Sequence, residues 1–123
     1  MTTQEVANRY YELAQRGQIE QIQDELYAST AVSIESENES DLPIRVVGLP
    51  AMRQKEQQYY QQVAEMHGGQ SGVPIVAGRF FACTQSMDIT LKGQPRRNKE
   101  QVCVFEVIDG KIVSEQFIYN DAD

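Results

Sequence analysis

The dipeptide Asp109-Gly110, set between two apolar segments, restricts the fold of this chain more than any other feature. A two-residue turn of type I′ needs positive φ at both central positions, which this dipeptide tolerates well. Residues 98–108 and 111–119 on either side have the apolar and β-branched character of strands. An antiparallel hairpin is therefore predicted near the C-terminus.

Further strands are predicted before this hairpin, and helices are predicted before those. Residues 80–91 indicate a long strand, joined to the hairpin by a looser turn with Gly93 and Pro95. Thr2 and Glu5 fit a capping box. The helices are expected at residues 2–17, 19–27 and 50–67, and short strands at 31–35, 45–48 and from 75. Helices followed by antiparallel strands indicate an α+β fold, with the helices on one face of a curved sheet.

Length and charge limit the remaining possibilities. The 123 residues suit one domain spanning 1–123. Eleven Lys and Arg residues against 18 Asp and Glu residues give a net charge of -7, which disfavours nucleic acid and anionic membranes as partners. No apolar stretch approaches the roughly 20 residues of a membrane span, and the N-terminus lacks signal-peptide features. A cytoplasmic location is expected.

Cysteine and histidine are too scarce for several common kinds of site. Cys83 and Cys103 are the only cysteines, and His67 is the only histidine. Their spacing fits neither a zinc site nor a redox motif, and His67 before Gly68 looks like the end of a helix. The chain also lacks a glycine-rich nucleotide fingerprint. We therefore expect neither a metal nor a cofactor.

Strand parity predicts which side chains line an internal pocket. A regular hairpin at Asp109-Gly110 gives the pairs Ile108 with Lys111, Val107 with Ile112, Phe105 with Ser114 and Cys103 with Gln116. The odd positions of residues 80–91 are the more apolar, so they are expected to face inward. The resulting inward cluster is Gln85, Met87, Gln101, Cys103 and Gln116. Buried glutamines need partners, which favours a polar or water-filled pocket.

The opposite sheet face is expected to contact another sheet. In the same register it carries Val102, Val104, Val113 and Phe117. Such a face is too apolar for free solvent, which suggests a homodimer through the outer face of the sheet.

Four segments carry a resemblance to a known family: RYYELAQRGQIEQI, AVSIES, GLPAMRQ and, most specifically, VFEVIDGKIVSEQFIY. In these features the chain resembles SnoaL-like proteins of the NTF2-like superfamily, which have a cystatin-like α+β cone fold. The resemblance implies N-terminal helices in the concavity of a strongly curved, mainly antiparallel sheet, an apolar pocket and often a homodimer. It implies no single reaction, because such relatives include cyclases, isomerases, hydrolases and noncatalytic proteins.

The catalytic residues of such relatives match this sequence only in part. SnoaL-like cyclases carry an acid before the turn, at a position that looks like Cys103 here. Ketosteroid isomerases use a tyrosine that corresponds to Tyr10 and a base whose position corresponds to Ile34. The neighbouring Glu35 is expected to face the other way.

Three catalytic candidates follow, and each has a structural alternative. Tyr10 is either an oxyanion donor or a helix residue packed on the sheet. Cys103 is either a nucleophile or a small core residue. No histidine or basic residue is placed to lower the pKa of its thiol, which favours the core residue. Asp88, like Glu115, is expected on the outer face, where a surface charge is the alternative to acid-base chemistry.

These patterns favour a domain that binds a small, mostly apolar organic molecule in a neutral pocket without a complete catalytic set. The expected ligand-binding residues are Tyr10, Gln85, Met87, Gln101, Cys103 and Gln116. The alternative is a cofactor-independent lyase, isomerase, cyclase or hydrolase that uses acid-base chemistry. A carboxyl of Asp88, Glu35 or Glu115 that lines the cavity with a raised pKa would favour this alternative.

Overall fold

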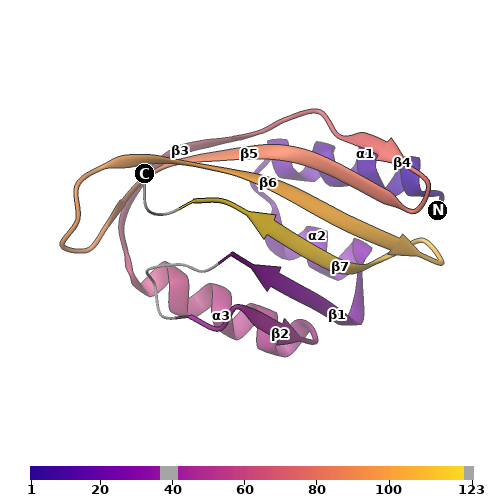
Figure 1. Ribbon diagram of the computed structural model, residues 1–123, viewed down its shortest axis with the longest axis horizontal. Helices are drawn as coiled ribbons and strands as arrows, with labels where there is room; N and C mark the ends of the chain where they lie inside the picture. The colour runs from indigo at the N-terminus through magenta and orange to yellow at the C-terminus, as the bar shows by residue number, and fades with distance from the viewer. Residues whose placement is uncertain (37–41, 121–123) are drawn as a thin grey trace.

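A computed structural model describes residues 1–36 and 42–120 (Figure 1). Its helices are α1 (Thr3–Gln15), α2 (Ile19–Leu26) and α3 (Leu49–Gln61). Its strands are β1 (Tyr27–Glu35), β2 (Arg45–Val47), β3 (Val63–Ser71), β4 (Ile75–Ala77), β5 (Phe80–Leu91), β6 (Arg97–Ile108) and β7 (Lys111–Ile118).

The strands form one mixed sheet in the order β2-β1-β7-β6-β5-β3, and β4 also pairs with β5. Neighbouring strands are antiparallel except for β1 and β7, which run parallel. In Figure 1 the helices α1 and α2 lie behind the sheet, and α3 lies beside β1 and β2. This arrangement confirms the predicted α+β class with the helices packed against one face.

Local sequence signals account for the parts of the fold that were predicted well. The capping box is present, because Thr2 Oγ1 accepts from the Glu5 amide at 3.1 Å and Glu5 accepts from the Thr2 amide at 2.9 Å. Asp109 and Gly110 have φ angles of 51° and 74°, as the type I′ turn requires. The predicted boundaries of the long strand at residues 80–91 are confirmed.

The third helix is shorter than its periodicity predicts. It ends at Gln61, and the segment expected to complete it, including His67, belongs to β3, which pairs with β5. Gly69, and Gly72 just after β3, permit close approach to β5 rather than a helix cap. A Cβ atom on Gly69 would lie 3.1 Å from the Ser86 carbonyl oxygen, and one on Gly72 would lie 2.6 Å from Thr84 Oγ1. The prediction of a helix to His67 was therefore wrong.

A β-bulge changes the predicted register of the C-terminal hairpin. Val107 pairs with Ile112 as expected, but the next pair is Glu106 with Ser114, so Val113 is an extra residue on β7. The Val107 amide donates instead to the Arg79 carbonyl oxygen at 2.7 Å. From this point every residue of β7 is turned to the opposite face. The predicted pairing of Cys103 with Gln116 is wrong, and Cys103 pairs with Phe117.

The core lies between α1, α2 and the inner face of the sheet. Tyr10 packs on the rings of Phe81 and Phe105, with centroids 5.6 Å and 4.6 Å away. The odd residues of β5 face this core, as predicted, and Cys83 lies opposite Cys103.

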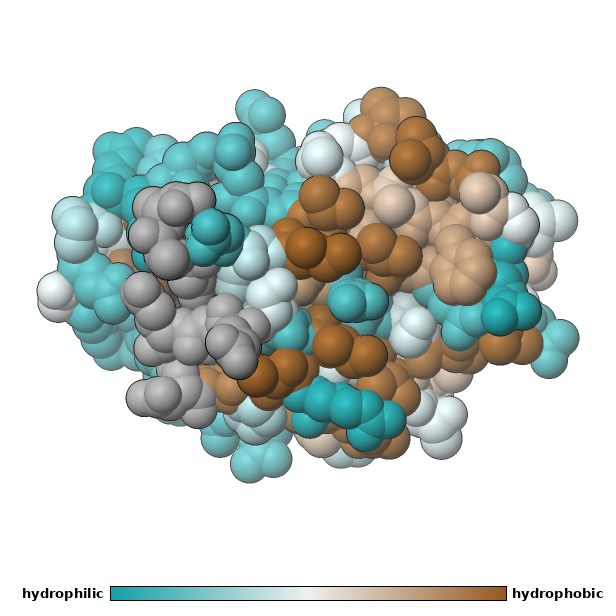
Figure 2. Space-filling view, viewed as in Figure 1, coloured by the Kyte–Doolittle hydropathy of each residue, from teal (hydrophilic) through white to brown (hydrophobic). Residues whose placement is uncertain are grey.

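The outer face carries exposed apolar residues, which Figure 2 shows as brown atoms over the middle and right of the view. Val102 and Ile118 are paired neighbours there, with exposures of 43% and 47%. Phe117, which was expected on this face, lines the internal cavity instead because of the bulge. Within the described residues, no helix is long and apolar enough to cross a membrane.

Candidate functional site

An internal cavity of about 200 Å³ lies between the helices and the inner face of the sheet. Residues of α1, α2, α3, β1, β5, β6 and β7 line it. Ligand pockets commonly measure about 300–1,000 Å³, so this cavity is at the small end and suits a small molecule. Its walls combine aromatic rings with carboxyl, amide and amino groups.

Glu115 is the most perturbed carboxyl of the cavity. It comes from β7 and is only 5% exposed. The Tyr27 hydroxyl donates to Oε1, and the Ser33 hydroxyl donates to Oε2 at 2.7 Å. Burial raises the pKa of Glu115 to about 7, although the hydrogen bonds from Tyr27 and Ser33 act in the opposite direction. Near neutral pH this carboxyl can both accept and release a proton.

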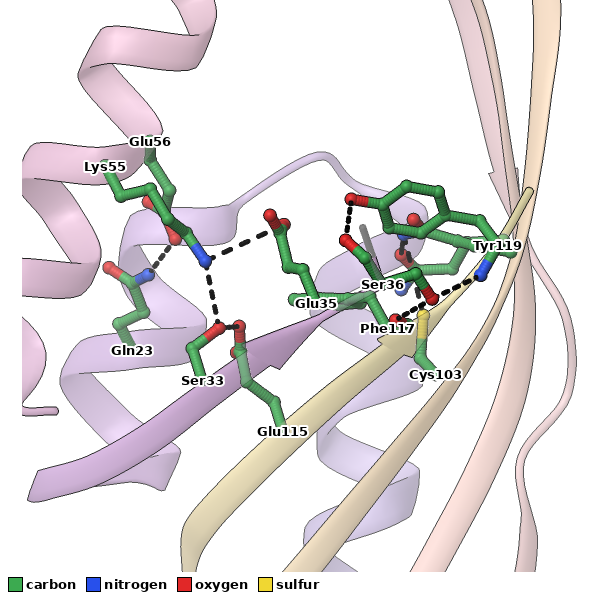
Figure 3. A network of polar contacts seen from close by, with 12 residues as sticks. Gln23, Ser33, Glu35, Ser36, Lys55, Glu56, Cys103, Glu115, Phe117 and Tyr119 are labelled. Atoms are coloured by element: carbon green, nitrogen blue, oxygen red, sulfur yellow. Dashed lines mark hydrogen bonds and ion pairs between the residues drawn. The ribbon is translucent and has the colours of Figure 1, made fainter. Parts of the chain in front are cut away.

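Lys55 provides a cation beside this carboxyl. It lies on α3, is only 6% exposed and lines the cavity. Its Nζ donates to Ser33 Oγ at 3.3 Å and lies 3.7 Å from Glu35 Oε1. The side chains of Lys55, Ser33 and Glu115 therefore form a continuous polar chain across the space between α3 and β7 (Figure 3).

A second polar group lies on the helical side of the cavity. Gln23 Nε2 donates to Glu56 Oε1 at 2.6 Å, and Arg53 Nε donates to Gln23 Oε1 at 3.0 Å. Burial raises the pKa of Glu56 above its usual value. Both Gln23 and Glu56 line the cavity, so the amide anchors one of its carboxyls.

A chain of neutral hydrogen-bonding groups forms the wall near the core. Gln85 Nε2 donates to the Tyr10 hydroxyl at 2.8 Å, and Gln101 Nε2 donates to Gln85 Oε1 at 3.1 Å. All three residues and Met87 line the cavity, which confirms their predicted inward orientation. Their expected role in ligand binding stays a prediction.

Comparison with known protein families and solved structures places this fold among known relatives. The SnoaL-like domain family matches residues 1–119. The chain belongs to this SnoaL-like family. A comparison with curated proteins found no match.

Solved structures extend this relationship. A candidate SnoaL-like polyketide cyclase from Mesorhizobium loti is 32% identical, with a TM-score of 0.88, over 97% of this chain and 100% of that chain. TerC, co-crystallised with polyporic acid, is 14% identical, with a TM-score of 0.79, over 98% of this chain and 92% of that chain. A candidate isomerase from Bacillus subtilis is 16% identical, with a TM-score of 0.74, over 98% and 90% of the two chains. The last two comparisons show the fold alone.

Two carboxyls of this SnoaL-like chain were expected to face away from the cavity. Glu35 lines it, whereas Ile34 does not, because Ser33 and Glu35 share the inner face of β1. Glu115 lines it because of the bulge in β7. The expectation of a neutral pocket was wrong, because Glu35, Glu56, Glu115, Lys55 and Lys99 are among the lining residues.

Three of the predicted site residues lie elsewhere among the described residues. Gln116 is exposed on the outer face because of the bulge. Asp88 accepts two hydrogen bonds from Arg96, at 2.9 Å and 2.6 Å, and this pairing lowers its pKa. Cys103 is fully buried in the core, and its contact with Cys83 together with burial raises the pKa of its thiol. None of the three is among the residues that line the cavity.

Tyr27 and Lys55 were missed by sequence reasoning, for different reasons. The helical spacing predicts Tyr27 at the end of a helix, whereas Tyr27 begins β1 and points its hydroxyl at Glu115. Lys55 lies three residues after Met52 and four before Tyr59, so helical spacing alone places it on the inward stripe of α3. That spacing is a signal that could have found it.

Proposed function

We propose that this chain is a cofactor-independent enzyme of the isomerase or cyclase type, which moves a proton on a small, mostly apolar carbonyl compound. Glu115 carries the proton in this proposal. The observation that supports it most is the raised pKa of about 7 of the Glu115 carboxyl, which is buried and lines the cavity. An effective general base or acid titrates near the working pH.

The chemistry needs no group beyond those that line the cavity. The ionised Glu115 carboxylate removes a proton from the carbon next to the substrate carbonyl. The C–H bond breaks, its electron pair forms the enolate, and an O–H bond forms on Glu115. Returning this proton to another carbon of a conjugated enolate completes an isomerisation. Attack of the enolate carbon on a second carbonyl instead forms a ring, and the resulting alkoxide oxygen takes the proton back from Glu115.

The shape and walls of the cavity favour a compact, partly apolar substrate. Tyr10, Tyr59 and Phe117 supply aromatic surface, and the Gln85 and Gln101 amides supply groups that orient a polar substituent. Structures similar to this chain include a candidate polyketide cyclase and a candidate isomerase. Cyclisation and isomerisation of carbonyl compounds both commonly begin with removal of a proton next to the carbonyl.

Deuterium exchange tests the proposal directly. We expect the protein to accelerate exchange of the α-protons of 2-tetralone in D₂O, followed by proton NMR, with activity rising through a pKa near 7. Glu115→Gln should lower the protein-dependent rate by about 10²-fold or more, since general bases contribute about 10²–10⁴-fold.

Glu20→Gln is the matched control, because Glu20 is exposed on α2. Its exchange rate should equal that of the unchanged chain. Binding of 2-tetralone without accelerated exchange would indicate a noncatalytic ligand-binding domain and contradict the proposal. Equal rates for Glu115→Gln and the unchanged chain would exclude Glu115 as the base.

A further inference from the structure

We propose that Lys55 forms a binding subsite for the oxygen of an enolised substrate, so that the cavity takes compounds with an enolisable carbonyl group. This inference rests on the proposed function, because it assigns the second pole of the same reaction. The juxtaposition that carries it is a buried ammonium and a buried carboxyl on either side of the Ser33 hydroxyl.

The position of Lys55 differs from that of an ordinary surface lysine. Its side chain is 7% exposed and reaches from α3 toward β1 and β7, rather than into solvent. Burying an ammonium is costly unless it is paired or serves a ligand. Of the residues described, Ser33 and Glu35 are its two oxygen contacts. An ammonium has three N–H donors, which leaves one for an oxygen in the cavity.

The spacing of the two charged groups suits a carbonyl and the carbon beside it. Ser33 Oγ lies 3.3 Å from Lys55 Nζ and 2.7 Å from Glu115 Oε2. A substrate placed beside this hydroxyl can direct its oxygen to Lys55 while the adjacent C–H bond faces Glu115. No glycine is among the described residues that line the cavity, so the Lys55 ammonium beside Ser33 is the donor that we assign to that oxygen.

The charges around the cavity change little during such a step. Glu35, Glu56 and Glu115 supply the carboxyls near Lys55, and Lys99 also lines the cavity. Proton transfer neutralises Glu115 and places the negative charge on the substrate oxygen. The charge thus moves from one side of Ser33 to the other, toward Lys55. Attraction to the ammonium stabilises the enolate more than the ketone, which is the differential binding that catalysis requires.

Phenols test this subsite without turnover, because a phenolate is a stable planar oxyanion. We choose 4-nitrophenol, whose absorbance distinguishes its neutral and ionised forms. The wild-type protein should bind the phenolate in preference to the phenol and lower the apparent pKa of the bound probe relative to free 4-nitrophenol. In Lys55→Met the affinity for the phenolate relative to the phenol should fall by about tenfold or more. The apparent pKa of the bound probe should therefore rise by about one unit or more.

Two further variants keep the test decisive. Lys55→Arg retains the cation and should retain the lowered pKa of the bound probe, even if Lys55→Met does not fold. Glu115→Gln should lower the rate of 2-tetralone exchange by about 10²-fold or more but still bind the phenolate, which separates the subsite from the base.

The outcomes distinguish an oxyanion subsite at Lys55 from a purely structural role of this side chain. An unchanged probe pKa in folded Lys55→Met would show that Lys55 is only the structural partner of Glu35. Failure of the wild-type protein to prefer the phenolate would also overturn the subsite. In both cases exchange of 2-tetralone, and with it the proposed function, would be unaffected.

Discussion

Burial of the Glu115 carboxyl disfavours its charged form and thereby moves its pKa toward the range of an effective general base. Its two oxygens accept from the hydroxyls of Tyr27 and Ser33, yet desolvation still raises its pKa to about 7. An exposed carboxyl at the same point of the chain would be ionised throughout the neutral range. Hydroxyl groups hold this side chain in place, whereas a direct salt bridge would keep it ionised and weaken it as a base.

The raised pKa of Glu115 predicts how stability changes with pH. Because the folded carboxyl titrates near 7 and an ordinary glutamate carboxyl has a pKa of 4.5, the folded state retains a proton that the unfolded state has lost between these values. The free energy of unfolding should therefore fall as pH rises from about 4.5 to about 7. The contribution of Glu115 to this fall is about 3 kcal/mol.

Glu115→Gln removes this contribution, so urea unfolding of both proteins at pH 5 and pH 8 measures it. Between pH 5 and pH 8, the free energy of unfolding of the unchanged chain should fall by more than that of Glu115→Gln. Comparing the two proteins cancels the parallel effect of Glu56, whose pKa is also raised. Equal changes in both proteins would contradict the assignment.

At the scale of elements, the bulge in β7 decides which residues reach the cavity. One extra residue, Val113, turns Glu115 and Phe117 inward and Gln116 outward. A strand's side chains alternate strictly, so a single inserted residue reverses every assignment beyond it. The predicted turn at Asp109-Gly110 was correct, and the two pairs next to it were also correct.

Features set by neighbouring residues could be predicted from the sequence, whereas features set by distant contacts could not. Local signals such as the capping box, the turn and the apolar alternation of β5 are fixed by neighbouring residues, so they were found. The bulge and the strand character of β3 depend on contacts with distant segments, namely Arg79 with Val107 and the close approach of Gly69 to Ser86. The candidate site consequently shifted from glutamines and Cys103 toward Glu115 and Lys55.

At the scale of the whole molecule, the outer face of the sheet is unlike a fully polar surface. Val102 and Ile118 lie side by side on it with nearly half of their area exposed, and Val104 and Val113 are partly buried. We propose that a second copy of the chain covers this face, since the apolar atoms gather over the middle of the sheet (Figure 2).

Sedimentation measures this association. We expect a mass twice that of the 14.0 kDa chain, and Val102→Asp should shift the protein toward the monomer because it places a charge within the apolar face. Met66→Asp, at an exposed position of the edge strand β3, is the control and should leave the mass unchanged. A monomeric mass for the unchanged chain would contradict the proposal.

The ionisation of Glu115 is the property on which the account of the cavity depends most. Carbon-13 NMR of glutamate side-chain carboxyls, titrated from pH 4 to pH 9 and assigned by the signal that Glu115→Gln removes, measures it directly. We predict that the Glu115 carboxyl titrates with a pKa near 7. A pKa near the ordinary glutamate value of 4.5 would contradict the account, because the carboxyl would then be ionised throughout the neutral range rather than a base matched to neutral pH.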